Sequence, residues 1–370
     1  MDIKVYTEIE QGQKWLNKYN GSIPVFTCTL GFTATALLPD ISTAGATPES
    51  RRYTALADAE FLVKGIQKNP TFPLPPLSVG ISPTFISRAV IEKFNLPLYV
   101  FNAGLLQFPS VKNINLGGKP ANCVSTGKAL PLAIVKHLYH KGLYWGEILA
   151  KEAKSSYLIL SECVVGGTTT ALAVLTALGI SADGKVNSSH PICNHQQKFL
   201  LVQEGLSKAG FKNQNTLVDP LEIIAAVGDP MQIFVAGIAL SGSKTVGIML
   251  AGGTQMLAIF ALIKALKNSF YTKANLKNII IGTTRWVAED STGDTIGLSK
   301  IIGNISLCAT NLNFDTSLYP RLTAYEKGYV KEGVGAGGSA IASHLLGINK
   351  EELLHMIEAI VSRFHLTTNS

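Results

Sequence analysis

Hydrophobic residues follow two kinds of pattern along the chain. Short apolar runs rich in β-branched and aromatic residues are typical of buried strands, whereas apolar residues three and four apart are typical of helices. The predicted strands occupy residues 23–30, 96–101 and 278–282, and the first parts of 157–179 and 246–264. Helices are expected at residues 83–93, 130–140, 144–153, 196–209 and 350–363. This alternation predicts a three-layer α/β fold, with a mostly parallel, Rossmann-like sheet and helices on both faces.

The length of 370 residues allows either one large α/β domain or two smaller ones. A proline-rich break at residues 70–76 is the best candidate for a hinge, but a single helix and strand on either side do not make separate domains. We therefore expect one domain over residues 1–370, with a small helical lobe made by the N- and C-terminal segments.

Composition and charge exclude several classes of protein. Apolar residues make up 46% of the chain and charged residues 15%, which excludes a disordered protein. The net charge of +7 comes from scattered Lys and Arg residues without a dense basic stripe, so we expect no nucleic-acid partner. An anionic small substrate or a generally basic surface explains the charge equally well.

The cysteines and the apolar runs bear on the compartment. Five widely spaced cysteines, with no C-x-x-C pair, indicate the reduced thiols of a cytoplasmic protein. The start, MDIKVYTEIEQ, has no apolar signal core. The one run that resembles a membrane span, residues 245–262, is divided by Gly252, Gly253, Thr254 and Gln255, so it indicates a strand, a turn and a helix instead.

The segment 157–179, YLILSECVVGGTTTALAVLTALG, carries the strongest sign of chemistry. It predicts a buried strand, a glycine turn at Gly166 and Gly167, and a helix that Thr168 to Thr170 open. Glycines let the backbone approach a ligand, and the N–H groups at a helix start favour an anion. Because all the glycine turns follow strands, they should meet at one edge of the sheet, where such folds bind ligands.

Known phosphate loops differ from this turn. It lacks the Gly-Lys-Ser/Thr ending of a P-loop and the G-x-G-x-x-G of a dinucleotide fold. Transferases that use a pyrophosphorylated ribose carry two adjacent acids after the strand, and here Glu162 stands alone. This argues against a magnesium-bound pyrophosphate donor and favours a donor with a single phosphate. An ordinary strand-to-helix turn with a threonine cap would give the same local pattern.

Glu332 is the second candidate for chemistry. It precedes the glycine-rich run from Gly333 to Gly338 and an apolar helix, so backbone there can aim its carboxylate at a ligand. Partial burial would raise its pKa toward that of a useful general base. The alternative is a capping or solvated glutamate. Asp229, before Pro230, is interpreted first as a helix cap and second as a ligand.

The sequence offers little for a metal or a nucleophilic cysteine. His190, Cys193 and His195 have metal-like spacing, but no partner pair of similar spacing exists elsewhere, so no metal site is predicted. Cys163 follows Glu162 without a nearby base and is interpreted as a buried thiol.

Four motifs, in order, resemble one known family. ECVVGGTTTALAVL, LEIIAAVGDPMQ, IMLAGGTQMLAIFAL and KEGVGAGGSA are similar to motifs of nicotinate-nucleotide:dimethylbenzimidazole phosphoribosyltransferases, in particular their archaeal and cyanobacterial branch. The similarity covers nearly the whole chain. It implies a phosphoribosyltransferase-type α/β domain that transfers phosphoribose from nicotinate mononucleotide to a lower-ligand base, giving an α-ribazole-type 5′-phosphate for cobalamin assembly. It also implies a cytoplasmic homodimer that needs no cofactor.

The resemblance assigns roles to individual residues. Glu332 matches the catalytic glutamate that takes the N–H proton of the incoming base, and Glu162 matches an acidic residue of the donor motif. Lys198 matches a phosphate-binding lysine. The substrate-binding set further comprises Gly166, Gly167, Thr168 and Thr169 around the donor phosphate, Gly333 and Gly335 in the run after Glu332, and Thr47, Pro48 and Tyr53 in the base pocket.

Departures from the family pattern leave the acceptor base open. Val164 and Gly167 stand where the family has a glycine and an asparagine, and the usual aromatic residue and glutamine of the base pocket are not clearly present. Dimethylbenzimidazole and adenine therefore both stay candidates. Two other functions also stay open: a transferase that uses a pyrophosphorylated donor, and a non-catalytic nucleotide-binding protein of corrinoid metabolism.

Overall fold

The computed structural model describes residues 2–75, 77, 79–211, 218–270 and 273–368. In these residues eight strands form a single sheet in the order β1-β8-β7-β6-β5-β2-β3-β4. All neighbours pair in parallel except β1, which is antiparallel to β8. The strands are β1 (Ile3–Val5), β2 (Val25–Gly31), β3 (Leu98–Gly104), β4 (Ile114–Asn115), β5 (Tyr157–Cys163), β6 (Gly247–Ala251), β7 (Ile279–Thr284) and β8 (Ser306–Thr310).

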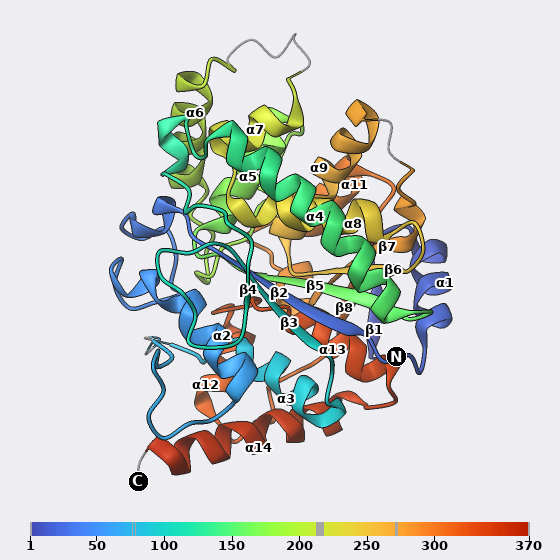
Figure 1. The fold of residues 1–370 in the computed structure, drawn as a ribbon. Coiled ribbons are helices and arrows are strands. Elements are labelled where there is room, and N and C mark those ends of the chain that lie inside the picture. Colours follow the sequence, from blue (N-terminus) through green and yellow to red (C-terminus); the bar gives the residue numbers. More distant parts are fainter. Residues whose placement is uncertain (1, 76, 78, 212–217, 271–272, 369–370) are drawn as a thin grey trace.

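Helices cover both faces of the sheet, which confirms the predicted three-layer α/β fold (Figure 1). One face carries α4 (Leu132–Ala153), α5 (Gly167–Ala177), α6 (His195–Lys208), α7 (Pro220–Val227), α8 (Pro230–Gly242), α9 (Thr254–Phe270) and α11 (Thr295–Ile302). The other carries α1 (Ile9–Tyr19), α2 (Thr54–Lys64), α3 (Thr84–Phe94), α10 (Arg285–Ala288), α12 (Pro320–Thr323), α13 (Ala336–Leu345) and α14 (Lys350–Thr368).

The central strands explain why the sheet is buried on both sides. In β5 the side chains of Leu158 and Leu160 join the core under α4 and α8, whereas Tyr157 and Ile159 join the core on the opposite face. Every residue of β5 is buried, as expected for a parallel strand covered by helices on both faces. A continuous run of β-formers is therefore needed here, and the sequence supplies it.

The predicted pair of helices at 130–140 and 144–153 is wrong, because α4 is one helix of 22 residues. Gly142 does not break it. A Cβ added at Gly142 would lie 2.4 Å from the carbonyl oxygen of Phe234 and 2.9 Å from the Cα of Gly237, so glycine lets α4 and α8 cross with their backbones in close contact. A glycine in a helix pattern here marks close packing and not an end.

Three strands of the sheet, β1, β4 and β8, were not anticipated from the sequence. The first predicted strand is β2, but β1 and α1 precede it, β4 follows β3, and β8 comes after β7. Three residues of β1 are held by pairing with β8, at Ile3 with Thr310 and Val5 with Cys308. Such a short edge strand has no local pattern of its own.

The chain ends lie in the layer that contains α3 and α13. There α14 packs against α3, and the end of α1 meets α13, with Gly21 N donating to Leu345 O (2.7 Å). The division into a single domain with a small lobe from the chain ends stays a prediction. Residues 70–75 of the proline-rich break form no helix or strand, and Pro76 lies outside the described residues.

Candidate active site

A cavity lies at the carboxyl ends of the central parallel strands. The strand order reverses between β2 and β5, because the chain adds β3 on one side and β5 to β8 on the other. This switch point is where α/β sheets bind ligands. The cavity walls come from residues 41–44, 162–168, 187–189, 253–255 and 330–334, together with Asp58, Ser82 and Pro83. The expected convergence of the glycine turns is thus confirmed for those after β5 and β6.

The wall formed by the turn after β5 is the beginning of a helix. Gly166 has a left-handed φ of 82° and precedes α5, and Gly167 and Thr168 line the cavity beside it. A Cβ at Gly167 would lie 2.1 Å from Oε1 of Gln255, so a side chain at this position would require the end of the Gln255 side chain to move. Helix α9 begins at Thr254 on the same cavity. Two helix N-termini therefore face one space, an arrangement that favours an anion.

Glu162 is the penultimate residue of β5 and lines the cavity at the end of that strand, which we call the floor. It is 6% exposed, and its Oε2 accepts a hydrogen bond from Val164 N (2.7 Å). Burial, followed by the nearby charge of Asp229, raises its pKa to about 8. A carboxyl group with this pKa is largely protonated at neutral pH and becomes charged when a cationic group approaches.

Glu332 also lines this cavity, and four donors hold its carboxylate. Its Oε2 accepts from Thr283 Oγ1 (3.2 Å) and Thr284 N (3.0 Å), and its Oε1 from Gly333 N (3.2 Å) and Gly337 N (3.0 Å). Burial raises the pKa of this carboxyl to about 7, although these donors act to lower it. A fixed carboxylate that titrates near neutral pH suits a general base.

Two more acids lie near the floor. Asp229 caps α8 as predicted, with a capping box to Gln232, and its Oδ2 also accepts from Thr170 Oγ1 (2.6 Å). Asp58, which the sequence analysis missed, lines the cavity and accepts from Ser82 Oγ (2.6 Å) and Cys163 Sγ (3.5 Å). Burial raises the pKa of both acids to about 6. The floor is therefore acidic, whereas the helix starts above it favour an anion.

Lys198 lies behind the cavity wall. It is fully buried, and its Nζ donates to the carbonyl oxygen of Asn187 (2.5 Å), a residue that lines the cavity. Burial lowers the pKa of Lys198 to about 8. The ammonium group thus supports the wall at residues 187–189 from behind.

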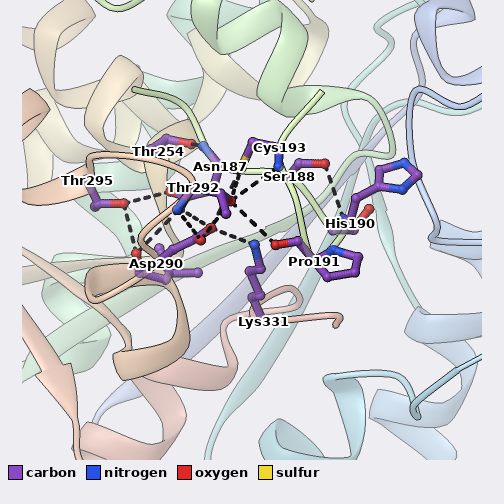
Figure 2. A network of polar contacts seen from close by, with 12 residues as sticks. Asn187, Ser188, His190, Pro191, Cys193, Thr254, Asp290, Thr292, Thr295 and Lys331 are labelled. Carbon is purple, nitrogen blue, oxygen red and sulfur yellow. Dashed lines mark hydrogen bonds and ion pairs between the residues drawn. The ribbon is translucent and has the colours of Figure 1, made fainter. Parts of the chain in front are cut away.

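A buried ion pair, also missed from the sequence, joins two walls (Figure 2). Lys331 Nζ lies 2.5 Å from Asp290 Oδ2, and their side chains are 2% and 5% exposed. Asp290 also accepts from Asn187 Nδ2 (3.0 Å), from Thr292 N and Oγ1 (3.0 and 2.8 Å) and from Cys193 Sγ (3.7 Å). Burial acts to raise the pKa of Asp290, but the bonds from Lys331, Asn187 and Thr292 outweigh it and the pKa is lowered. No local signal in the sequence singles out this pair, because both residues lie among other charged residues such as Glu289, Asp294 and Glu332.

The structure does not bring all predicted site residues to the cavity. Of the described residues, those that line it do not include Thr47, Pro48 and Tyr53. Thr47 and Ser50 bond to each other, Thr47 N to Ser50 Oγ (3.0 Å) and Ser50 N to Thr47 Oγ1 (3.1 Å), and Tyr53 stacks on Phe72. Neither Thr47 nor Ser50 caps α2, which begins at Thr54. Residues 41–44 of the same loop line the cavity instead.

Two further predicted residues lie just outside the lining. Thr169 is fully buried in the first turn of α5, and Gly335, with a left-handed φ of 72°, precedes α13. A Cβ at Gly335 would lie 2.5 Å from that of Ser161, so this glycine allows the turn after Glu332 to pack on β5. These two positions shape the walls from behind.

The residues with metal-like spacing bind other groups. His190 Nε2 lies 3.0 Å from Asp40 O, His195 Nε2 lies 2.6 Å from Thr292 O, and Cys193 belongs to the Asp290 network. In the part of the chain that the structure describes, no group of three or more His, Cys, Asp or Glu residues is placed to hold a metal ion. Cys163 is a buried thiol, as predicted.

None of the helices among the described residues has the length and apolar character to cross a bilayer.

Comparison with known proteins places the chain in a group of relatives. It is 60% identical to a UPF0284 protein of Rippkaea orientalis over 97% of this chain and 98% of that protein. It is 59% identical to a UPF0284 protein of Gloeothece citriformis, covering 98% and 97% of the two chains. No family model matches the sequence.

Solved structures with the same fold carry the name that the four motifs suggested. The crystal structure of CobT from Thermus thermophilus matches with a TM-score of 0.59 at 16% identity, covering 90% of this chain and 84% of that one. A structure of nicotinate-nucleotide-dimethylbenzimidazole phosphoribosyltransferase from the same organism matches with a TM-score of 0.58 at 15% identity, covering 95% and 92%. The expected likeness of fold is thus confirmed, and at 52–60% identity to relatives over nearly its full length the chain belongs to the UPF0284 family.

Proposed function

We propose that this protein is a phosphoribosyltransferase that moves the phosphoribosyl group of nicotinate mononucleotide to an aromatic lower-ligand base, releasing nicotinate and an α-ribazole-type 5′-phosphate. The observation that carries the proposal is that Glu332 and the start of α5 line one and the same cavity. The fold shared with CobT and the four ordered motifs support the same assignment.

The donor would bind with its phosphate at the helix starts. Gly166, Gly167 and Thr168 open α5, and Thr254 opens α9, so backbone N–H groups and two positive helix ends face the phosphate. Lys198 adds a cation behind this wall through Asn187. In this proposal Lys198 does not bind the phosphate directly but supports Asn187, a residue of the cavity lining, from behind.

Transfer would proceed by displacement at the ribose carbon. A nitrogen of the base attacks C1′ while the bond from C1′ to nicotinate breaks, and its electron pair neutralises the pyridinium ring. Attack opposite the leaving group inverts C1′ and gives the α product. Glu332 accepts the proton from the base, and the acidic floor at Glu162 stabilises the positive charge that develops on the ribose. Nicotinate leaves as a neutral ring, so its departure needs no acid.

A nicotinate-release assay tests this proposal. Purified protein is incubated with nicotinate mononucleotide and a panel of purines and benzimidazoles, with and without chelator, and nicotinate is quantified by chromatography. Release that depends on a base and survives the chelator supports the proposal. Turnover only with a pyrophosphorylated ribose and magnesium would assign the other transferase class. Donor binding by calorimetry without release for any base would indicate a non-catalytic binding protein.

The acceptor base and the oligomer also belong to the proposal. The same panel decides between dimethylbenzimidazole and adenine. A homodimer in the cytoplasm is what the family resemblance implies, and sedimentation of the purified protein tests the dimer.

A further inference from the structure

The turn that precedes Glu332 is strained. Lys331 N donates to Tyr329 O (2.8 Å) and Glu332 N donates to Val330 O (2.9 Å), so two three-residue turns follow each other. Their central residues, Val330 and Lys331, have φ values of 68° and 69°. Such γ-turns with positive φ are rare, and a β-branched residue in this region is a clear outlier. A strained turn persists only where its surroundings hold it.

Three contacts hold the turn in place. Thr284 Oγ1 donates to the carbonyl oxygen of Lys331 (2.6 Å), and Val330 N donates to Ser189 O (3.3 Å). The third contact is the buried ion pair, in which Lys331 Nζ lies 2.5 Å from Asp290 (Figure 2). Of these, only the ion pair fixes the turn through a side chain of its own.

Hydrogen bonds from Thr292 and Asn187 hold the Asp290 carboxylate independently of Lys331. It follows α10, and Thr292 donates to it through both its backbone N–H and its hydroxyl group. Asn187, which lines the cavity wall supported by Lys198, donates through its side-chain amide (3.0 Å). The same carboxylate therefore contacts the wall assigned to the donor and the turn that carries the assigned base.

We propose that Asp290 is a positioning residue, which through Lys331 holds the strained turn and thereby aims Glu332 at the acceptor base. This inference rests on the proposed function, because Glu332 is the group being aimed. In this inference the ion pair contributes to proton removal from the acceptor base by Glu332, and not to binding of the donor. The network also links the two walls, so the position of Glu332 is set relative to the wall at Asn187.

The test compares four variants with the wild-type chain. Asp290→Asn removes the charge at the centre of the network, Lys331→Met removes the ammonium group but keeps the stem, and the double variant removes both. Glu289→Gln is the matched control, since Glu289 is the neighbouring carboxylate, pairs with Lys4 (2.8 Å) and is 43% exposed. Nicotinate release gives kcat and KM, and hydrogen exchange by mass spectrometry follows the peptide over residues 329–334.

We expect each single variant to lower kcat about 10- to 100-fold, because a displacement of about 1 Å costs that much. The KM for nicotinate mononucleotide should change less than about threefold. The double variant should have a kcat no lower than that of the slower single variant, because both substitutions break the same ion pair. Exchange in the 329–334 peptide should accelerate in all three, and Glu289→Gln should match the wild type.

Several results would overturn the inference. A raised KM at unchanged kcat would make the pair a donor-binding device, and an unchanged kcat with a lower unfolding midpoint would make it only structural. Where Asp290→Asn does not fold, Lys331→Met decides alone, because Asp290 keeps its Asn187 and Thr292 donors in that variant. If the wild-type chain releases no nicotinate, the proposed function fails, and the exchange data still judge whether the pair holds the turn.

Discussion

Replacing Glu332 by glutamine is the most informative change in the cavity. One carboxylate oxygen becomes an amide nitrogen, which cannot accept from backbone N–H groups. If the nitrogen takes the Oε1 position, Gly333 N loses its acceptor, whereas Gly337 N keeps Oε2 at 3.2 Å. An unpaired buried N–H costs about 1–3 kcal/mol. The variant should therefore fold, with a modest loss of stability from this one bond.

Burial of the charged Glu332 carboxylate destabilises the wild-type protein at high pH, and this works against the stability loss of the variant. Its folded pKa of about 7 lies above the usual 4.5, so its contribution is complete below pH 4.5 and is lost as the pH rises through 7. At 1.36 kcal/mol per pKa unit the wild-type protein loses roughly 3 kcal/mol by pH 8.5. Urea unfolding should thus show Glu332→Gln less stable than the wild type at pH 4.5, and equally or more stable at pH 8.5.

Turnover should fall much further than stability. Loss of a general base lowers the rate about 10²- to 10⁴-fold, or roughly 3–5 kcal/mol in activation free energy. In the nicotinate-release assay the wild-type rate should decline below about pH 7 as Glu332 becomes protonated, and the variant should lack this decline. Calorimetry should find unchanged affinity for nicotinate mononucleotide. Wild-type turnover in the variant, or an unaltered acidic decline, would refute the role of Glu332 as base.

Three further changes probe other parts of the molecule. Glu162→Gln keeps an oxygen that can accept from Val164 N but no longer titrates. Because the folded pKa of Glu162 is about 8, the wild type should lose roughly 4 kcal/mol of unfolding free energy between pH 4.5 and 8.5, and the variant should not. Urea-unfolding curves of stability against pH that run parallel for the two proteins would contradict this. Lys198→Met should weaken donor binding about tenfold or more in calorimetry and leave base binding nearly unchanged, and equal weakening of both would count against its place at the donor end. Gly142→Leu should lower the unfolding free energy by about 1–3 kcal/mol, because α4 and α8 must move apart to admit the side chain. Lys141→Ala, at the exposed neighbouring position, should leave stability unchanged in the same urea-unfolding assay. A Gly142→Leu protein as stable as the wild type would show that the two helices do not pack closely at this crossing.

The sequence was informative wherever a feature is local. The strand, turn and helix around Gly166 follow from apolar runs and glycines within a single segment, and the cap at Asp229 follows from its neighbour Pro230. Glu332 stood out because a glycine-rich run follows it. These features need no knowledge of distant parts of the chain.

Features that depend on distant partners were missed. Lys331 and Asp290 lie 41 positions apart and meet only in the folded chain, and a positive φ at Val330 contradicts the local preference of valine. The loop at residues 41–54 shows the same limit, since Thr47 bonds to Ser50 and residues 41–44 face the cavity instead. Which part of a loop turns inward is decided by packing, not by its composition.

The cavity walls come from stretches of chain that are made at very different times. During synthesis the residues around Gly166 leave the ribosome when fewer than half of the 370 residues have been added, and Glu332 follows when about nine-tenths have been added. Because β1 pairs with β8, the sheet itself also waits for this late portion. Long-range pairing of this kind slows folding. A nascent chain therefore acquires the helix starts that favour an anion early and Glu332 only late, so we expect chains that stop before Glu332 to lack the proposed transfer.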